Sequence, residues 1–320
     1  MWKRLWQIGG ENRYGLRMKK TGCRGIFATT DIPAGERILE IPEEHIMRIE
    51  PLYERNPLLK KIYPQKQQRN DRMILHVYSL LTGQVEPTAS EKIYLSSLPK
   101  DYSNFCLFFD KKILKPLKGT CFSRKKEDRS DLFHSINHYQ QYYEDQMDRL
   151  GIPPEKKDAY RKAIVIVNSR IFQFQDGRKE VLGLVPIADL LNHSNEEGNT
   201  TWYFDNMKRV FVMETTVPIP TGRQVYDSYG NKTDIQLLYT YGFYMPKNTD
   251  GEIIIPSLNK PDLILRRQSP LNLDKSTKKT VKRYTVRIKK ILTILAPQHP
   301  LKRMLTDQLC VLEADEKNSA

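Results

Sequence analysis

Short apolar runs near the start of the chain predict strands rather than helices. Residues 13–47 are rich in such runs, and Arg37-Ile38-Leu39-Glu40-Ile41 is typical of a strand. The preceding Ile32-Pro33-Ala34-Gly35 has the chemistry of a tight turn, because Pro33 presets φ at the second turn position and Gly35 suits the fourth. We therefore expect the chain to open with a β-rich region.

The spacing changes to a helical period over residues 50–180. Residues 72–81 are predicted to form a helix, and the polar, aromatic segment 131–149 is predicted to form another. A third helix is predicted over 157–174, with one buried side formed by Tyr160, Ile164, Val167 and Ile171. Residues 94–99 are interpreted as a short connector. The block is therefore expected to be a helical insertion into a β-rich domain.

Strands are predicted to return over 183–228. Two apolar runs, 201–204 and 210–213, flank Asp205-Asn206, which is a suitable hairpin turn. Beyond Asp250 the spacing is helical again, and the predicted helices cover 278–295 and 300–314.

Length and composition narrow the class of protein. A chain of 320 residues is too long for one ordinary core and indicates two domains, or one domain with an insertion. No apolar run reaches 18 residues, so we expect no membrane span. The cysteines lie far apart without zinc-ligand spacing, so we expect free thiols, no structural zinc and a cytoplasmic location, with the nucleus as the alternative. They are Cys23, Cys106, Cys121 and Cys310.

The net charge of +14 is concentrated late in the chain. Residues 257–305 hold 13 Lys or Arg against two acids, Asp262 and Asp274. Such a segment favours an acidic partner, which is nucleic acid, an anionic membrane face or an acidic protein. The alternative is a solvated helix face without a partner.

Two segments carry the candidate chemistry. Pro186-Ile187-Ala188-Asp189-Leu190-Leu191-Asn192-His193-Ser194 contains an Asn-His pair, and Asp227-Ser228-Tyr229-Gly230 places a tyrosine 36 residues after the histidine. Each segment alone is weak, since both patterns occur by chance in many chains. Their order and spacing, together with the segments around them, point to a methyl-transfer site.

With these segments the chain resembles the SET-domain methyltransferases. It is most similar to those whose SET domain is split by a helical insertion, the Rubisco large-subunit lysine methyltransferase group and its animal relatives. The matching segments are Gly22-Cys23-Arg24-Gly25-Ile26-Phe27-Ala28 with Asp31-Ile32, Asn168-Ser169-Arg170, Pro186 to Ser194, Tyr229-Gly230-Asn231 and Tyr241-Gly242-Phe243.

The resemblance implies an α+β fold in which small curved sheets surround a strand-loop crossing, a pseudoknot. The SET domain would cover 13–245, with its helical insertion at about 50–180. A short, basic C-terminal helical region over 251–320 would then be a candidate substrate-binding region.

The resemblance also implies S-adenosylmethionine as methyl donor, a protein substrate and no metal. Tyr229 would be the catalytic residue, with its hydroxyl beside the transferring methyl. The implied donor-binding residues are Gly22, Cys23, Arg24, Arg170, Asp189, Leu190, Leu191, Asn192, His193, Tyr241, Gly242 and Phe243. Ordinary structural roles compete with these assignments: a surface tyrosine at 229, a turn cap at Asn192, and core packing for the late aromatic residues.

The residue before Asp189 bears on the acceptor. Relatives that methylate an actin histidine have tryptophan there, whereas lysine-directed relatives carry a small residue, as Ala188 is here. No cysteine-rich zinc segment of the histone-directed kind follows Tyr229. We therefore expect a protein-lysine N-methyltransferase acting on a non-histone protein. The alternatives are a protein-histidine N-methyltransferase, an inactive SET-fold adaptor that binds an acidic partner, and a nucleic-acid-binding protein.

Overall fold

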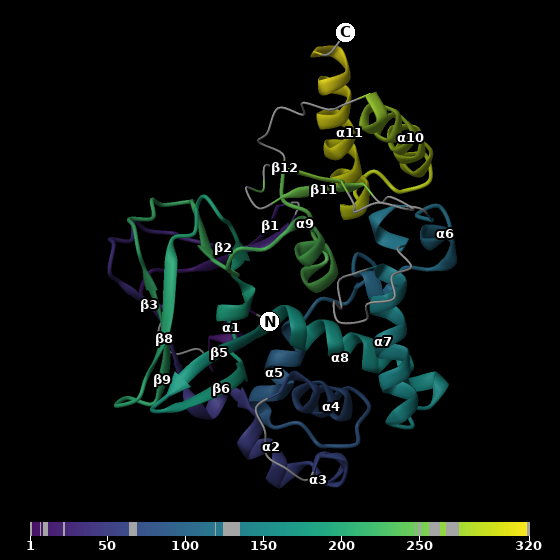
Figure 1. Cartoon of the computed structure of the whole chain (residues 1–320). Coiled ribbons are helices and arrows are strands. Elements are labelled where there is room, and N and C mark those ends of the chain that lie inside the picture. Colours follow the sequence, from purple (N-terminus) through teal and green to yellow (C-terminus); the bar gives the residue numbers. More distant parts are fainter. Residues whose placement is uncertain are drawn as a thin grey trace. The chain divides into compact units, whose positions relative to one another are not determined.

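The computed structural model describes residues 2–6, 8, 12–21, 23–63, 69–118, 120–123, 135–246, 248, 251–255, 263–266 and 275–318. The chain divides into two compact units, and each is built from two separate stretches of chain. The first unit comprises Met1–Lys100 and Pro153–Gly230, and the second comprises Asp101–Ile152 and Asn231–Ala320. Figure 1 labels their helices and strands.

Three small sheets form the β part of the first unit. The four-stranded sheet has the order β1 (Arg17–Thr21), β2 (Cys23–Phe27), β10 (Gln224–Asp227), β7 (Asn192–His193). The second has the order β3 (Arg37–Pro42), β9 (Val210–Thr215), β8 (Thr200–Asp205), and the third β4 (Met47–Arg48), β6 (Lys179–Leu184), β5 (Ile171–Asp176). Fully buried apolar residues of these strands, including Ile26, Ile41 and Phe211, join one core.

The helices of the first unit fall mostly between β4 and β5 in the chain. They are α1 (Trp2–Leu5), α2 (Ile49–Arg55), α3 (Pro57–Ile62), α4 (Asn70–Leu81), α5 (Ala89–Ser97) and α8 (Lys157–Arg170), with short 3₁₀ turns η1 (Glu43–His45), η4 (Pro154–Lys156) and η5 (Ala188–Leu190). Helices α4 and α8 pack together through Tyr78 and Tyr160, whose ring centroids are 5.4 Å apart. Helix α4 confirms the prediction over 72–81.

One prediction about this helical part is wrong, and another is confirmed except at the end of its helix. Residues 94–99 were expected to be a connector, but α5 runs through Ser97. Its start is fixed by a reciprocal capping box, in which Glu91 N–H donates to Thr88 Oγ1 at 3.2 Å and Thr88 N–H donates to Glu91 Oε2 at 2.7 Å. The helix predicted over 157–174 ends at Arg170, because Ile171 already pairs with Leu184 in the β5–β6 ladder.

The predicted β8–β9 hairpin is confirmed, but its turn is longer than Asp205-Asn206. The Asp205 carboxylate accepts the backbone N–H groups of Met207 and Lys208 at 3.0 and 3.1 Å, which closes the turn. Arg209 then adopts φ 55°, a conformation that side-chain-bearing residues seldom take. The Pro33–Gly35 turn also holds, with Gly35 at φ 77°.

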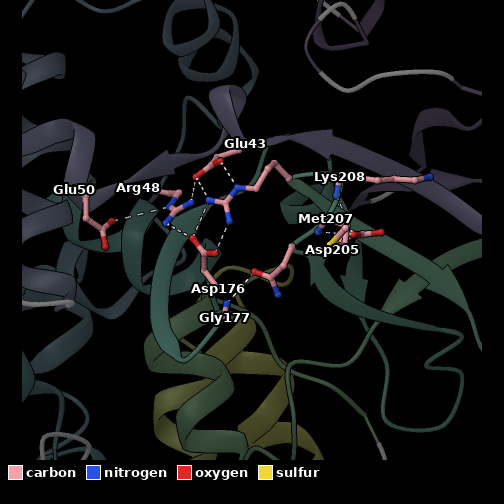
Figure 2. Close-up of polar contacts among 10 residues, drawn as sticks. Glu43, Arg48, Glu50, Asp176, Gly177, Asp205, Met207 and Lys208 are labelled. Atoms are coloured by element: carbon pink, nitrogen blue, oxygen red, sulfur yellow. Dashed lines mark hydrogen bonds and ion pairs between the residues drawn. The ribbon is translucent and has the colours of Figure 1, made fainter.

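The side chain of Arg209 joins an ion network with Arg48, Glu43 and Asp176, and Glu50 adds a contact to Arg48 at 4.0 Å (Figure 2). Arg48 and Arg209 each pair with both Glu43 and Asp176, including a 2.8 Å contact from Arg48 to Asp176. Both guanidinium groups also lie over the ring of Phe204. The arginines hold the pKa of Asp176 below its usual value, so the network links β4, the β5–β6 turn and the β8–β9 turn.

The second unit is mostly helical. Its elements are η2 (Cys106–Phe108), α6 (Lys111–Leu114), η3 (Cys121–Ser123), α7 (Ile136–Arg149), α9 (Asp234–Gln236), η6 (Leu237–Tyr241, a π-helical turn), β11 (Glu252–Ile255), β12 (Leu263–Arg266), α10 (Lys275–Leu292) and α11 (Pro300–Asn318). Helices α10 and α11 pack side by side (Figure 1).

The predictions for the second unit are mostly confirmed. Helices α7, α10 and α11 correspond to the predictions over 131–149, 278–295 and 300–314, although 131–134 lies outside the described residues. The β11–β12 hairpin was not predicted. The described thiols of Cys106 and Cys121 are buried, and that of Cys310 is exposed. Across the described residues, no helix is long and apolar enough to span a bilayer.

Candidate functional site

Strands β7 and β10 bring the two key segments together. They pair in parallel, with Tyr226 opposite Asn192 and Asp227 opposite His193. The pairing continues past the strands, since Ser194 N–H donates to Asp227 O at 3.2 Å. The Asn-His pair therefore lies beside the strand that leads directly into Tyr229.

Tyr229 is held at both its backbone and its hydroxyl. Its N–H donates to His193 Nδ1 at 3.0 Å, and its hydroxyl donates to Leu191 O at 2.7 Å. The rings of His193 and Tyr229 also stack, with centroids 4.9 Å apart and planes 16° apart. The tyrosine side chain thus turns back over the Asn-His segment, which excludes a tyrosine whose hydroxyl simply points away from the protein.

A buried charge cluster lies just before the Asn-His pair. The Asp189 side chain has no solvent exposure, and its Oδ2 accepts hydrogen bonds from the Tyr94 hydroxyl at 2.6 Å and from Arg170 Nη1 at 3.1 Å. Arg170 Nη1 also donates to the Asp189 carbonyl at 3.1 Å. Burial alone would lower the pKa of Arg170, but the Asp189 carboxylate outweighs it and raises that pKa, with Tyr94 and Tyr229 contributing in the same direction.

Backbone strain precedes this cluster. Ile187 is fully buried and adopts φ 70°, ψ −49°, while Ala188 N–H donates to Pro186 O at 2.9 Å. This is a three-residue γ-turn with positive φ, which is costly for a β-branched residue. Such strain persists only where the surroundings over-determine it, as at functional sites. Here the turn sets the direction in which η5 presents Asp189.

Strand β2 forms the other edge of the site. Asn192 Nδ2 donates to Arg24 O at 2.9 Å, and the Arg24 side chain donates to Ser97 O at 2.5 Å. A side chain at Gly25 would collide with Gln224 Nε2 and stand 3.0 Å from Asn192 Nδ2. The backbone at Gly25 is therefore approached by two side-chain amides, and the Asn192 amide bonds to β2 instead of capping a local turn.

Asp189 and Gln224 each have a buried polar side-chain atom without a hydrogen-bond partner within the described part of the chain. One is Asp189 Oδ1, an acceptor, and the other is Gln224 Nε2, a donor. Buried polar groups are normally hydrogen-bonded, so each of these atoms is a place where a bound polar group would be stabilised.

The closing aromatic segment belongs to the second unit. Gly242 ends the π-helical turn at φ 69°, and a side chain there would stand 3.0 Å from the ring of Phe105. The rings of Tyr241 and Phe243 have centroids 6.2 Å apart. Within this unit, glycine at 242 is required by both its positive φ and the close approach of Phe105.

The remaining predicted site residues are less informative. Gly22 lies outside the described residues, and Cys23 is described only as the first residue of β2. Leu190 is buried in the core, whereas Leu191 contributes its carbonyl to Tyr229. In the described part of the chain, no group of three or more His, Cys, Asp or Glu residues is placed to hold a metal ion.

Comparison with known proteins identifies the family. The SET domain family model matches residues 23–230, from β2 to the glycine after Tyr229. The chain belongs to the SET domain family. The matched residues include both segments that the β7–β10 pairing joins, and the resemblance inferred from the sequence is confirmed.

The curated relatives include actin-histidine N-methyltransferases from Canis lupus familiaris and Homo sapiens. They are 25% identical over 254 residues and 24% identical over 250 residues, and each alignment covers 72% of this chain. The matched regions make up 40% and 39% of those proteins, so this chain spans about two fifths of their length.

Solved structures share the fold. The SET domain of LSMT bound to lysine and AdoHcy has a TM-score of 0.61 and 18% identity, covering 98% of this chain and 90% of that one. Rubisco LSMT bound to AdoMet has a TM-score of 0.62 and 16% identity, covering 98% and 91%. These similarities confirm the expected α+β SET fold.

Several residues that shape the site were not predicted. The Tyr94 hydroxyl holds Asp189 from a helix 95 residues away in the chain. The Asn199 side chain makes two hydrogen bonds to the backbone of β10: its Nδ2 donates to Gln224 O at 3.1 Å, and its Oδ1 accepts from Tyr226 N–H at 2.8 Å. The sequence has no local signal for these contacts, although the capping box at Thr88 would have revealed the helix that carries Tyr94.

Proposed function

We propose that this SET-family protein is an S-adenosylmethionine-dependent protein N-methyltransferase. The observation that carries the proposal is the double fixation of Tyr229, by His193 at its backbone and by Leu191 O at its hydroxyl. A methyl transfer needs little covalent help from a protein, so catalysis rests on alignment and electrostatics. A rigidly held hydroxyl beside a buried charge cluster suits that requirement.

The residues present fit the proposed donor. Its amino-acid end carries an ammonium and a carboxylate, and when bound the donor supplies an electrophilic methyl group on a sulfonium. Asp189 Oδ1 is a buried acceptor suited to an ammonium, and Gln224 Nε2 is a buried donor suited to a carboxylate. Arg170 donates to Asp189 through Nη1, so its other N–H groups can bind the donor's carboxylate.

The hydroxyl of Tyr229 has a defined orientation, set by the hydrogen bond that it donates. Its proton is directed at Leu191 O, and a phenolic oxygen that donates one hydrogen bond also carries lone pairs that can accept. They can accept weak CH···O contacts from an electron-poor methyl or an N–H of the acceptor. An acceptor amine must be neutral to attack, and transfer from water into an apolar channel lowers its pKa. Tyr229 would then orient the neutral amine.

We propose a lysine of a non-histone protein as the acceptor. Ala188, immediately before Asp189, is a small residue that is 1% exposed. The histidine-directed relatives described by the resemblance have tryptophan there. Histidine is the second candidate, because the curated relatives are named actin-histidine N-methyltransferases. The small residue at 188 favours lysine over this alternative.

Calorimetric titration with S-adenosylmethionine tests the donor site. Micromolar binding by the natural chain that is lost in Asn192→Ala supports the site, because this substitution removes the amide that joins β7 to Arg24 O. A labelled-methyl assay on cell proteins, followed by mass spectrometry, then locates the methyl on a lysine Nζ or a histidine ring nitrogen. Labelling that is equal with Tyr229→Phe would contradict the proposed catalytic role.

A further inference from the structure

Helix α10 carries an unusual charge distribution. Its 18 residues include eight bases and no acid. The bases are Lys275, Lys278, Lys279, Lys282, Arg283, Arg287, Lys289 and Lys290. Within the basic segment 257–305, the structure describes residues 263–266 and 275–305, and α10 makes up much of this described part.

The bases occupy one side of the helix. At about 100° per residue, positions 278, 279, 282, 283, 287, 289 and 290 fall within one half of the helical circumference, and all seven residues are exposed. The opposite half is apolar and buried, with Val281, Tyr284, Ile288 and Ile291 each at most 4% exposed. The solvent half of α10 is therefore a cationic face, defined here by those seven residues.

The cationic face conflicts with the local rules of helix stability. Like charges repel at three i,i+4 spacings within it, which are Lys278–Lys282, Lys279–Arg283 and Arg283–Arg287. The first turn has no acid, although the positive end of the helix dipole favours one there. An ordinary solvated helix would intersperse acids. Sequences that break local rules in this way do so mostly at functional sites, and here a bound polyanion would relieve both conflicts.

The structure distinguishes between kinds of polyanion. A helix that inserts into a membrane surface needs its apolar side available, but that side of α10 is buried within the second unit, where α10 packs on α11.

Positions 278–290 extend over about 18 Å of helix axis, which gives about one charge per 2.6 Å. A nucleic-acid strand carries about one phosphate per 3.4 Å, so the charge density of the face is close to that of such a strand.

Lys289 of the cationic face has an acidic neighbour. Lys289 pairs with Glu313 of α11 at 2.7 Å, and both side chains are exposed. An exposed pair of this kind is worth little and gives way readily to a stronger anion. The pair lies toward the C-terminal end of α10, so we expect the main contacts to come from the part of the face around Lys282 and Arg283.

We propose that the cationic face of α10 binds the phosphate backbone of nucleic acid without regard to base sequence. Lysine and arginine on this face would contact successive phosphates, and the exposed Val286 between them would contact sugar. The proposal goes beyond the methyltransferase function and does not depend on it, because the binding requires neither donor nor acceptor.

Fluorescence anisotropy with labelled 20-nucleotide RNA, single-stranded DNA and duplex DNA tests this proposal, using the full chain without methyl donor. We expect binding to all three probes, with log affinity falling against log salt at a slope of about −3 or steeper, since each phosphate contact contributes about −0.7 to −0.9. A scrambled-sequence probe should bind equally. Absence of binding at 50 mM salt would overturn the proposal.

A matched pair of variants distinguishes binding by this face from a general effect of the protein's net charge. Lys282→Glu/Arg283→Glu alters the face, whereas Lys162→Glu/Lys179→Glu makes the same charge change on exposed residues of the first unit. We expect at least tenfold weaker binding for the first variant and less than twofold for the second, with unchanged melting temperatures. Equal losses, or polyglutamate binding as tightly as the oligonucleotides, would refute a nucleic-acid site.

Discussion

His193 Nδ1 accepts the backbone N–H of Tyr229 at 3.0 Å while the two rings stack 4.9 Å apart. An imidazole nitrogen that accepts a hydrogen bond carries no proton, so His193 is neutral here with its proton on Nε2. The contact also joins β7 to the segment after β10. His193 therefore positions Tyr229 within the site, and general-base chemistry is not needed to explain it.

Replacing His193 should disturb the position of the Tyr229 side chain while leaving the tyrosine itself in place. His193→Ala loses both the acceptor nitrogen and the stacked ring, so we expect kcat/KM for methyl transfer to fall roughly 10- to 100-fold. His193→Asn retains a side-chain acceptor near the position of Nδ1 and should recover part of that loss. His138→Ala on α7 serves as the control. Equal activity of the natural chain and His193→Ala would show that Tyr229 needs no such support.

The Arg170–Asp189 pair should behave as a coupled buried ion pair. Asp189→Asn leaves a largely buried guanidinium without its carboxylate, and we expect a loss of about 3 kcal/mol in the free energy of unfolding. Replacing both partners, as Arg170→Met/Asp189→Asn, should cost less than the sum of the single changes Arg170→Met and Asp189→Asn. Urea unfolding of the four proteins measures the coupling. Strict additivity would mean that the pair contributes no interaction of its own.

The fold was predictable from sequence where the signals are local. Two apolar runs around a turn revealed the β8–β9 hairpin, and helical spacing revealed α4 and α10. The change from α8 to β5 was missed, because Ile171 continues the helical spacing of α8 while also starting a strand. At that position the pairing of β5 with β6 outweighs the local pattern.

The candidate site was only partly predictable. The residue types at 189, 192, 193 and 229 were found through the family resemblance, because strand β7 has only two residues and pairs with a strand more than 30 residues later. No local pattern reveals such a pairing. The hydrogen bond from Tyr94 to Asp189 and the γ-turn at Ile187 depend in the same way on the surrounding structure.

Gly25 should be irreplaceable because of its neighbours rather than its φ angle. A methyl group there would collide with the amide of Gln224 and crowd that of Asn192. We expect Gly25→Ala to weaken S-adenosylmethionine binding at least tenfold and to lower the free energy of unfolding by about 1–3 kcal/mol, as overpacking does. Calorimetry and urea unfolding measure the two effects.

A second substitution tests the cause. Gln224→Ala removes the worst of the collision, so the Gly25→Ala/Gln224→Ala variant should regain stability relative to Gly25→Ala alone. If the double variant is less stable than either single variant, the collision with Gln224 is not the reason that position 25 requires glycine.

Asp227 should make the protein less stable as the pH rises. The residue is 4% exposed, and burial raises the pKa of its carboxyl from the ordinary 3.8 to about 6, although the Ser228 N–H works in the opposite direction. The folded state therefore keeps this proton to a higher pH than the unfolded state does. Stability from this group is fully present below pH 4, declines between about pH 4 and 6, and stays low above that range.

Asp227→Asn removes the ionisable group while keeping an oxygen that can accept the Ser228 N–H. A difference of about two pH units corresponds to at most about 3 kcal/mol, so the variant should be more stable than the natural chain by about 1–3 kcal/mol at pH 7.5 and equally stable at pH 4. Urea unfolding at both pH values measures this, with the surface variant Asp158→Asn as control. Equal stability at pH 7.5 would mean that Asp227 is already ionised in the fold at little cost.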